Sequence, residues 1–248
     1  MTVVAAIQFA PILLDAEKNV VVGTQLAFEA AGKGARVIVL PELCTSGYVL
    51  RNIREASSVA QEKDGWQTQE FAKVARTFGC HVVFGYVETC EGKLYNSAAV
   101  VGPAGLVANV RKHNRFGADN IWCTPSEQVP PVVVTEAGRL GVLICRDAMN
   151  KYRDSSPAYK VGQKFYSRGS VDTIALLTNW GANYGYPDSS WVELCEETGA
   201  NIIVSNRVGR ERDMKYKGGS VVIDRTGNCQ TFGSNFCTEA VVGGKIIL

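Results

Sequence analysis

Four groups of reactive or polar side chains follow apolar, strand-like runs in this chain. In a sheet flanked by helices, the carboxyl ends of neighbouring strands line one crevice, so groups remote in sequence can meet there. A thiol, a carboxylate and an ammonium in one pocket would support nucleophilic cysteine catalysis, with a base and a charge stabiliser beside the nucleophile. The groups are Glu42 after residues 37–41, Lys112 after residues 106–110, Cys145 after residues 142–144, and Asn179 with Trp180 after residues 176–178.

Each of these residues taken singly has an ordinary structural explanation. A cysteine that follows Leu-Ile is usually an inert core residue. A single Glu or Lys at a strand end is usually a solvated rim residue. Only the joint pattern of thiol, carboxylate and ammonium favours a catalytic site.

The composition limits the classes of partner. The chain has 248 residues, of which 46% are hydrophobic, which is enough for one substantial core, and we expect a single domain over residues 1–248. Charged residues make up 20% and the net charge is +2, so no field of one sign is expected to attract nucleic acid or a membrane surface. A small, neutral or weakly charged ligand fits this balance better.

The cysteines and histidines give little support for a metal site. None of the eight cysteines forms a C-x-x-C pair, and the only histidines are His81 and His113. A zinc site would therefore need unpaired ligands, and we expect neither a metal nor a cofactor. The small number of histidines also limits Ser-His-Asp and Cys-His chemistry.

The first residues lack a basic leader, and Asp15 and Glu17 come too early for a secretory signal. No apolar run approaches the roughly 18 residues that a membrane span needs. We expect a cytoplasmic protein whose thiols are reduced.

Short β-branched runs alternate with longer amphipathic stretches. The sequence Gly102-Pro103-Ala104-Gly105 is a strong turn signal, so the runs on either side of it, 94–101 and 106–110, are predicted to form a hairpin. Strand-helix-strand units and hairpins together predict a mixed sheet system covered by helices. Further strands are predicted over residues 3–9, 36–40, 81–87, 140–145, 171–178, 201–205 and 240–248, and helices over residues 17–31, 65–78 and 188–198.

Three segments resemble the signatures of the nitrilase, or carbon-nitrogen hydrolase, superfamily, in the same order. Leu-Pro-Glu-Leu-Cys-Thr-Ser-Gly-Tyr at residues 40–48 resembles the first signature, which contains the catalytic Glu. Arg-Lys-His at 111–113, followed by Phe116, resembles the second, with its catalytic Lys. Leu-Gly-Val-Leu-Ile-Cys-Arg-Asp at 140–147 resembles the third, with its nucleophilic Cys. Later landmarks at 177–180, 203–209, 218–224 and 226–227 extend the resemblance over nearly the whole chain.

The resemblance implies the fold and the assembly. It implies an α/β fold, the family's α-β-β-α sandwich, in which two sheets lie face to face with helices outside. Pairing of two such chains across a dimer interface would extend this four-layer sandwich, so we expect a homodimer or a higher homo-oligomer.

The resemblance also implies roles for individual residues. Glu42 is expected to act as base, Lys112 as charge stabiliser and Cys145 as nucleophile. Many family members have a second Glu seven residues after the Lys, and this chain has Asp119 there. Asp119 is therefore either an auxiliary site residue or an ordinary cap or loop aspartate.

The implied activity is hydrolysis of a small linear amide to a carboxylic acid and ammonia through a thioester. Arg146-Asp147 stands after Cys145 where true nitrilases typically have Trp-Glu, which favours amide or carbamoyl cleavage over nitrile hydration. There are two alternatives. The chain could be an N-carbamoyl amino-acid or amine hydrolase, or a catalytically silent family member that acts as a binding protein.

The substrate itself is not specified by these residues. Tyr48, Asn179 and Trp180 are candidate substrate-binding residues. Tyr48 and Trp180 would form pocket walls, although core packing would equally explain both. Arg146, or Lys151 or Arg153, could pair with a substrate carboxylate, and the alternative for Arg146 is a structural ion pair with Asp147.

Overall fold

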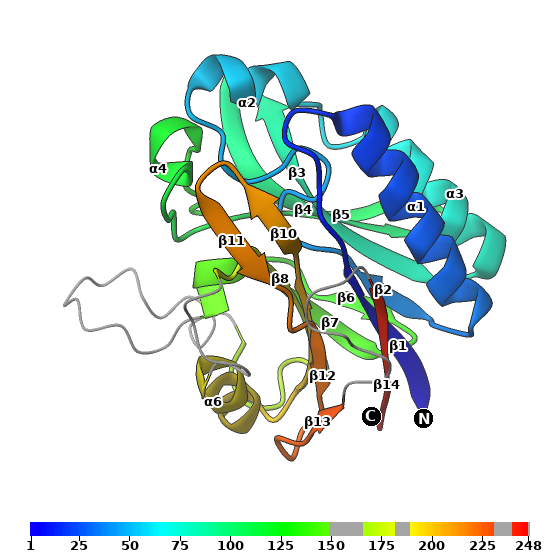
Figure 1. Ribbon diagram of the computed structural model, residues 1–248. Helices are drawn as coiled ribbons and strands as arrows, with labels where there is room; N and C mark the ends of the chain where they lie inside the picture. The colour runs from blue at the N-terminus through cyan, green and yellow to red at the C-terminus, as the bar shows by residue number, and fades with distance from the viewer. Residues whose placement is uncertain (149–165, 182–188, 231–239, 248) are drawn as a thin grey trace.

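Two six-stranded β-sheets form the centre of the protein in the computed structural model, which describes residues 1–148, 166–181, 189–230 and 240–247 (Figure 1). The first sheet contains, in spatial order, β14 (Ala240–Ile246), β1 (Thr2–Gln8), β2 (Val37–Val39), β3 (His81–Cys90), β4 (Lys93–Gly102) and β5 (Gly105–Arg111). The second contains β13 (Cys229–Gln230), β12 (Val221–Ile223), β9 (Asn201–Asn206), β8 (Thr173–Thr178), β7 (Gly138–Ile144) and β6 (Val133–Thr135).

The strands of the first sheet are apolar on both faces. In β1, Val4 and Ala6 belong to the core that also contains the second sheet, whereas Ala5 and Ile7 belong to the core beneath the helices. Successive side chains of a strand point to opposite faces, so each strand contributes to two separate cores. This explains why the sequence of β1 shows a continuous apolar run.

Helices cover the outer faces of the sheets. Figure 1 shows α1 and α3 together on one side of the first sheet, with α6 on the far side of the molecule. The Asp15 side chain accepts a hydrogen bond from the Lys18 N–H at the start of α1, and Gly79 ends α3 in the left-handed conformation. The helices are α1 (Ala16–Gly32), α2 (Ile53–Val59), α3 (Trp66–Phe78), α4 (Asp119–Trp122), α6 (Ser189–Thr198) and a 3₁₀ helix (Cys145–Ala148).

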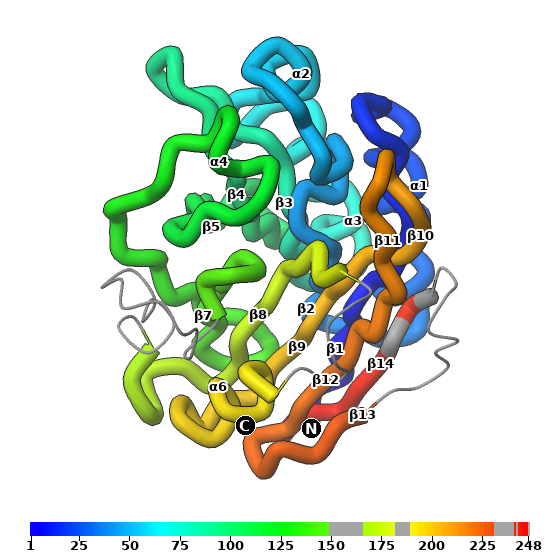
Figure 2. Tube along the Cα trace, turned by 60° about the vertical axis from the view of Figure 1, so that its left-hand side comes forward, coloured from blue at the N-terminus to red at the C-terminus, as the bar shows by residue number. Residues whose placement is uncertain are grey.

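Strand directions bring particular strand ends together. β2 runs parallel to β1 and β3, and β4 and β5 continue the same sheet as antiparallel strands, so β5 ends at the same edge as β2. β7, β8 and β9 run parallel in the second sheet and lie side by side in Figure 2. The carboxyl ends of β2, β5, β7 and β8 therefore carry the side chains of the candidate site.

The predicted α-β-β-α sandwich is confirmed, and so is the hairpin of β4 and β5. Most strand bounds differ from the predicted ones by a few residues. The sequence did not predict α2 or the small hairpin of β10 (Val208–Glu211) and β11 (Met214–Lys217), whose residues are largely polar. The predicted first residue of the third helix, Asp188, lies outside the described residues, and the single domain over residues 1–248 stays a prediction.

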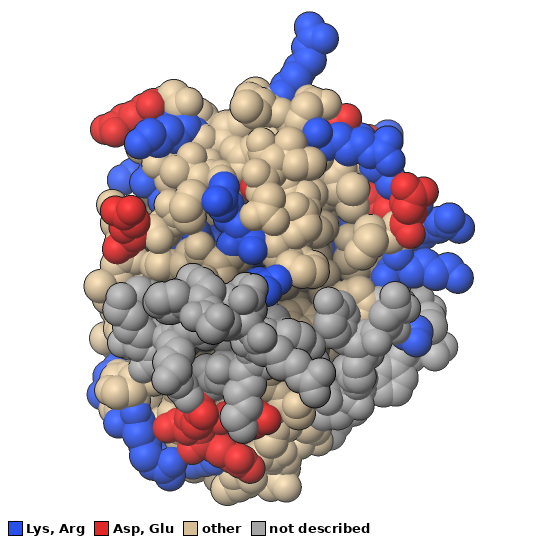
Figure 3. Space-filling view, turned by 90° about the vertical axis from the view of Figure 1, so that its left-hand side faces the viewer, with Lys and Arg blue, Asp and Glu red and all other residues tan. Residues whose placement is uncertain are grey.

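The surface in Figure 3 carries interspersed Lys, Arg, Asp and Glu side chains, in keeping with the small net charge. Among the described residues, no helix is both long and apolar enough to span a membrane.

Two valines of the second sheet test the packing between the sheets. Val142 in β7 is fully buried, whereas Val134 in β6 is 79% exposed. We expect Val142→Ala to lower the free energy of unfolding by about 2 kcal/mol, because it removes buried methyl groups and leaves a cavity. The control Val134→Ala should change it by less than about 0.5 kcal/mol. Urea denaturation measures both, and equal effects would contradict the packing described.

Candidate active site

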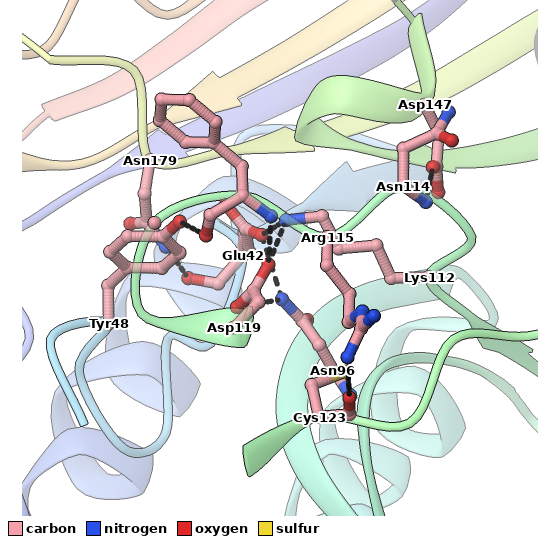
Figure 4. A network of polar contacts seen from close by, with 12 residues as sticks. Glu42, Tyr48, Asn96, Lys112, Asn114, Arg115, Asp119, Cys123, Asp147 and Asn179 are labelled. Carbon is pink, nitrogen blue, oxygen red and sulfur yellow. Dashed lines mark hydrogen bonds and ion pairs between the residues drawn. The ribbon is translucent and has the colours of Figure 1, made fainter. Parts of the chain in front are cut away.

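The Lys112 ammonium lies between two carboxylates at the edge of the first sheet. Its Nζ atom is 2.6 Å from Oε1 of Glu42 and 2.5 Å from Oδ2 of Asp119, and all three side chains are fully buried. Figure 4 shows the three side chains converging from the ends of β2 and β5 and from α4. The structure therefore brings Asp119, predicted only as a possible auxiliary residue, into direct contact with Lys112.

The Asn96 side chain of β4 hydrogen-bonds both carboxylates that contact the lysine. Its Nδ2 donates to Glu42 Oε1 at 2.8 Å and to Asp119 Oδ1 at 3.4 Å. The second Glu42 oxygen, Oε2, is also buried, and among the described residues it has no hydrogen-bond partner. One oxygen of Glu42 is thus fixed while the other is available to exchange a proton.

Burial and the neighbouring charges set the ionisation of this cluster. Burial raises the pKa of Glu42, the Lys112 ammonium opposes the rise, and Asp119 adds to it. Burial alone would lower the pKa of Lys112, but Asp119 and Glu42 together raise it well above its ordinary value. The lysine is therefore a permanent cation in the site.

A tight turn after β2 orients Glu42. Leu43 has a φ of 47°, in the left-handed region that non-glycine residues rarely adopt. β3 lies against this turn at Gly85, where an added Cβ would be 2.4 Å from the Leu43 nitrogen and 2.8 Å from Glu42 Cα. The Cys44 thiol donates to the Gly85 carbonyl at 3.3 Å. Only glycine allows β3 to approach this closely.

Cys145 begins the 3₁₀ helix directly after β7 and is 5% exposed. Its φ of 49° is also left-handed, so the backbone turns sharply at the sulfur-bearing residue. Burial raises the pKa of the thiol and Glu42 adds to this, while Lys112 and the Asn179 backbone N–H act to lower it. The resting sulfur is therefore a neutral thiol near the carboxylate and the ammonium.

Asn179 connects the two sheets at the site. Its backbone N–H acts to lower the pKa of the Cys145 thiol, and its side-chain Nδ2 donates to the Glu42 carbonyl oxygen at 2.9 Å. Predicted as a substrate-binding residue, Asn179 thus holds the segments that carry Glu42 and Cys145 together.

Tyr48 is anchored by a buried ion pair from β10. Its backbone N–H and that of Val49 donate to Glu211 Oε1 at 2.8 and 2.6 Å, and Glu211 pairs with Arg207. The Tyr48 hydroxyl donates to the Phe116 carbonyl at 2.6 Å. Tyr48 therefore links the loop after Glu42 to the loop after Lys112, and its ring centroid is 5.9 Å from Lys112 Nζ.

The other predicted substrate residues lie at the margins of this cluster. Trp180 is 6% exposed and packs edge-on against Trp191 in the core of the second sheet. The Arg146 guanidinium lies 4.9 Å from the centroid of the Phe116 ring. The alternatives Lys151 and Arg153 lie outside the described residues.

Sequence reasoning missed three buried residues that hold this site: Asn96, Asp147 and Glu211. Asn96 is a polar residue in the middle of the apolar strand β4, which is a signal that could have found it. The Asp147 carboxylate accepts hydrogen bonds from the backbone N–H groups of His113 and Asn114. No local pattern connects Glu211 to this site, because the Tyr48 and Val49 N–H groups that it accepts are 163 and 162 residues away in sequence.

In the part of the chain that the structure describes, no group of three or more His, Cys, Asp or Glu side chains is placed to hold a metal ion.

The sequence is similar to those of known carbon-nitrogen hydrolases. Residues 3–152 match the family model described as carbon-nitrogen hydrolase. A nitrilase from Pyrococcus abyssi is 30% identical over 98% of this chain and 88% of its own length. An omega-amidase from Xenopus tropicalis is 35% identical over 50% of this chain and 47% of its own length.

Solved structures show the same fold. An amidase from Nesterenkonia sp. superposes with a TM-score of 0.82 at 21% identity, covering 98% of this chain and 89% of that one. A mutant of the amidase from Nesterenkonia sp. AN1, which shows Michael addition of acrylamide at its active-site cysteine, gives a TM-score of 0.81 at 19% identity over 99% and 93% of the two chains.

The close approach at Gly85 can be tested by adding one methyl group. We expect Gly85→Ala to lower the free energy of unfolding by about 1–3 kcal/mol, because the turn that carries Glu42 must move away from β3. Gly243→Ala in β14 is the matched control, since an added Cβ there meets nothing within 4 Å. Urea denaturation measures both, and a Gly85→Ala protein as stable as the control would rule out the constraint.

Proposed function

The chain belongs to the carbon-nitrogen hydrolase family of the nitrilase superfamily, and from that premise we propose that it hydrolyses a small linear amide to a carboxylic acid and ammonia. Glu42, Lys112 and Cys145 are the catalytic residues of this proposal, with Asp119 as auxiliary residue. Relatives named amidase and omega-amidase support an amide as the substrate class.

The observation that carries the proposal is the free oxygen of Glu42. Because burial keeps the Cys145 thiol neutral, attack on an amide carbonyl requires a base that removes the thiol proton. Glu42 Oε2 is buried beside the ammonium with no hydrogen-bond partner among the described residues, and the raised pKa of Glu42 suits a group that both takes and returns a proton.

The first half of the reaction forms a thioester. Glu42 takes the thiol proton as the sulfur of Cys145 bonds to the carbonyl carbon. The Lys112 ammonium and a backbone N–H near Cys145 stabilise the resulting oxyanion, each by a few kcal/mol. The tetrahedral intermediate then collapses: Glu42 gives its proton to the amide nitrogen, the C–N bond breaks, and ammonia leaves.

The second half releases the acid. Glu42 takes a proton from water as the water oxygen attacks the thioester carbon. The C–S bond breaks, the carboxylic acid leaves, and the proton returns to the sulfur of Cys145. No cofactor takes part in these steps, and Lys112 remains a cation throughout.

The remaining parts of the proposal follow from the resemblance. We propose a cytoplasmic homodimer or higher homo-oligomer whose partner is a small-molecule substrate rather than nucleic acid or a membrane. Tyr48, Asn179 and Trp180 are proposed to shape or line the substrate pocket.

Removal of the nucleophile tests the mechanism. We expect Cys145→Ala to lower ammonia release from amides by at least about 1000-fold, and Glu42→Gln to lower kcat by about 100- to 10,000-fold. The exposed Cys229 offers a matched control, and Cys229→Ala should retain full activity. Mass spectrometry of the quenched wild-type enzyme should find the acyl group on Cys145. If amide hydrolysis survives Cys145→Ala, the mechanism is wrong.

A substrate panel tests the role of Arg146. If its guanidinium pairs with a substrate carboxylate, Arg146→Ala should lower kcat/KM at least about tenfold more for amides that carry a carboxylate than for neutral amides. Ammonia release from a panel of primary amides and N-carbamoyl compounds measures this and also identifies the preferred class. Unchanged discrimination between acidic and neutral amides would remove Arg146 from the binding site.

A further inference from the structure

The residue two positions after the nucleophile is bound to the loop that follows Lys112. Asp147 lies in the 3₁₀ helix that begins at Cys145, and its side chain is 2% exposed. Its Oδ1 accepts the Asn114 backbone N–H at 2.7 Å (Figure 4), and its Oδ2 accepts the His113 backbone N–H at 3.2 Å. One carboxylate thus holds two consecutive backbone amides.

These two amides belong to the residues directly after Lys112. β5 ends at Arg111, and the Lys112 N–H donates to the Asn96 carbonyl at 2.8 Å as the last contact with β4. Beyond this point the backbone leaves the sheet, and Asp147 supplies the acceptors that strand pairing no longer provides. The direction in which Lys112 leaves the sheet therefore depends on a side chain beside the nucleophile.

Arg146 contacts the same loop from the neighbouring position. Its guanidinium lies 4.9 Å from the centroid of the Phe116 ring, within the range of a cation–π contact. Both residues that follow Cys145 thus bind the segment that follows Lys112. Because β5 and β7 belong to different sheets, this contact spans the sandwich at the site.

We propose that Asp147 is a positioning residue that fixes the Lys112 ammonium relative to the Cys145 sulfur by binding the backbone of His113 and Asn114. The proposal rests on the proposed function, in which Lys112 stabilises the oxyanion formed at Cys145. A displacement of about 1 Å in such a group can lower a rate about 100-fold. Asp147 itself touches no reacting atom and acts only through the loop.

The ionisation of Asp147 makes this contact dependent on pH. Burial raises its pKa to about 7, against the opposing effects of the Lys112 ammonium and the two backbone N–H groups, while Glu42 adds to the rise. A protonated carboxyl accepts hydrogen bonds less strongly, so the contact weakens as pH falls below about 7. Among the described residues, the Tyr166 hydroxyl also responds to the Asp147 charge, and the Arg146 guanidinium is next to it in sequence.

The same shift affects stability with the opposite sign. The folded protein keeps the Asp147 proton up to about pH 7, whereas the unfolded chain releases it near the ordinary pKa of 3.8. The folded state therefore binds more protons in this window, and the contribution of Asp147 to stability decreases as pH rises through it. As pH rises toward 7, the Asp147 hydrogen bonds to the loop become stronger, while the contribution of Asp147 to the free energy of unfolding decreases.

Asp147→Asn tests the role, because asparagine keeps the size but offers one acceptor oxygen instead of two. We expect kcat for amide hydrolysis to fall about 10- to 100-fold with KM changed less than about threefold. Alkylation of Cys145 by iodoacetamide at a fixed pH should slow, since a displaced Lys112 lowers the thiol pKa less. Its pH profile should lose the inflection near 7 that we expect from Asp147 in the wild type.

Asp172→Asn is the matched control. The Asp172 carboxylate also accepts a backbone N–H, that of Arg139 at 2.8 Å, but at the opposite end of β7. We expect wild-type kcat and wild-type alkylation of Cys145 in this variant. If Asp147→Asn matches Asp172→Asn in kcat and in the alkylation profile, the positioning role is wrong.

Hydrogen exchange in the wild-type protein tests the contact without a variant that could fail to fold. The His113 and Asn114 amides should be protected one pH unit above the pKa of Asp147, and their protection factors should fall at least about threefold one unit below it. Exchange at the rate of an unstructured peptide on the alkaline side would overturn the proposal. If the wild type releases no ammonia from any amide, the proposed function fails, while alkylation and exchange still decide the role of Asp147.

Discussion

A buried ammonium between two buried carboxylates is the interaction on which the rest of the site depends. Removing a charge from water costs several kcal/mol even in a relaxed protein interior, and only close partners compensate for it. Lys112 has two such partners, Glu42 and Asp119, and Asn96 binds the same carboxylates. Loss of the ammonium would leave two buried carboxylates beside each other without a counter-charge, at a cost of about 3–5 kcal/mol. The fold must therefore hold all four side chains in fixed positions.

The two sheets keep these side chains in place because contacts between the sheets fix the ends of their strands. The apolar inner faces pack against one another and set the separation of the sheets. Polar contacts then fix their relative position, since Ser205 Oγ of β9 donates to the Ile7 carbonyl of β1 at 2.6 Å, and Asn179 Nδ2 donates to the Glu42 carbonyl at 2.9 Å. The segments that carry the Cys145 thiol and the Glu42 carboxylate are thus held in fixed relative positions.

A second buried ion pair supports the loops rather than the reacting groups. Glu211 of β10 pairs with Arg207 and accepts the backbone N–H groups of Tyr48 and Val49. The added Cβ of any residue other than glycine at position 47 would lie 2.6 Å from Glu211 Oε2, so the loop is tightly fitted to this carboxylate. Through the Tyr48 hydroxyl the same support reaches Phe116 and the segment after Lys112. Rigid loops of this kind suit a site whose residues must stay in fixed relative positions.

The sequence by itself determined the elements that depend on local pattern. β-branched runs and the turn at residues 102–105 predicted the strands and the β4–β5 hairpin, and the resemblance to family signatures led to Glu42, Lys112 and Cys145. The tertiary structure alone decided which sheet each strand joined, and it showed that Asp119 reaches Lys112 despite its shorter side chain. It also revealed Asp147 and Glu211 as acceptors for loop amides. Local periodicity reports which side of an element is buried. The Asp147 and Glu211 contacts join residues 33 to 163 positions apart, and only the folded backbone brings such residues together.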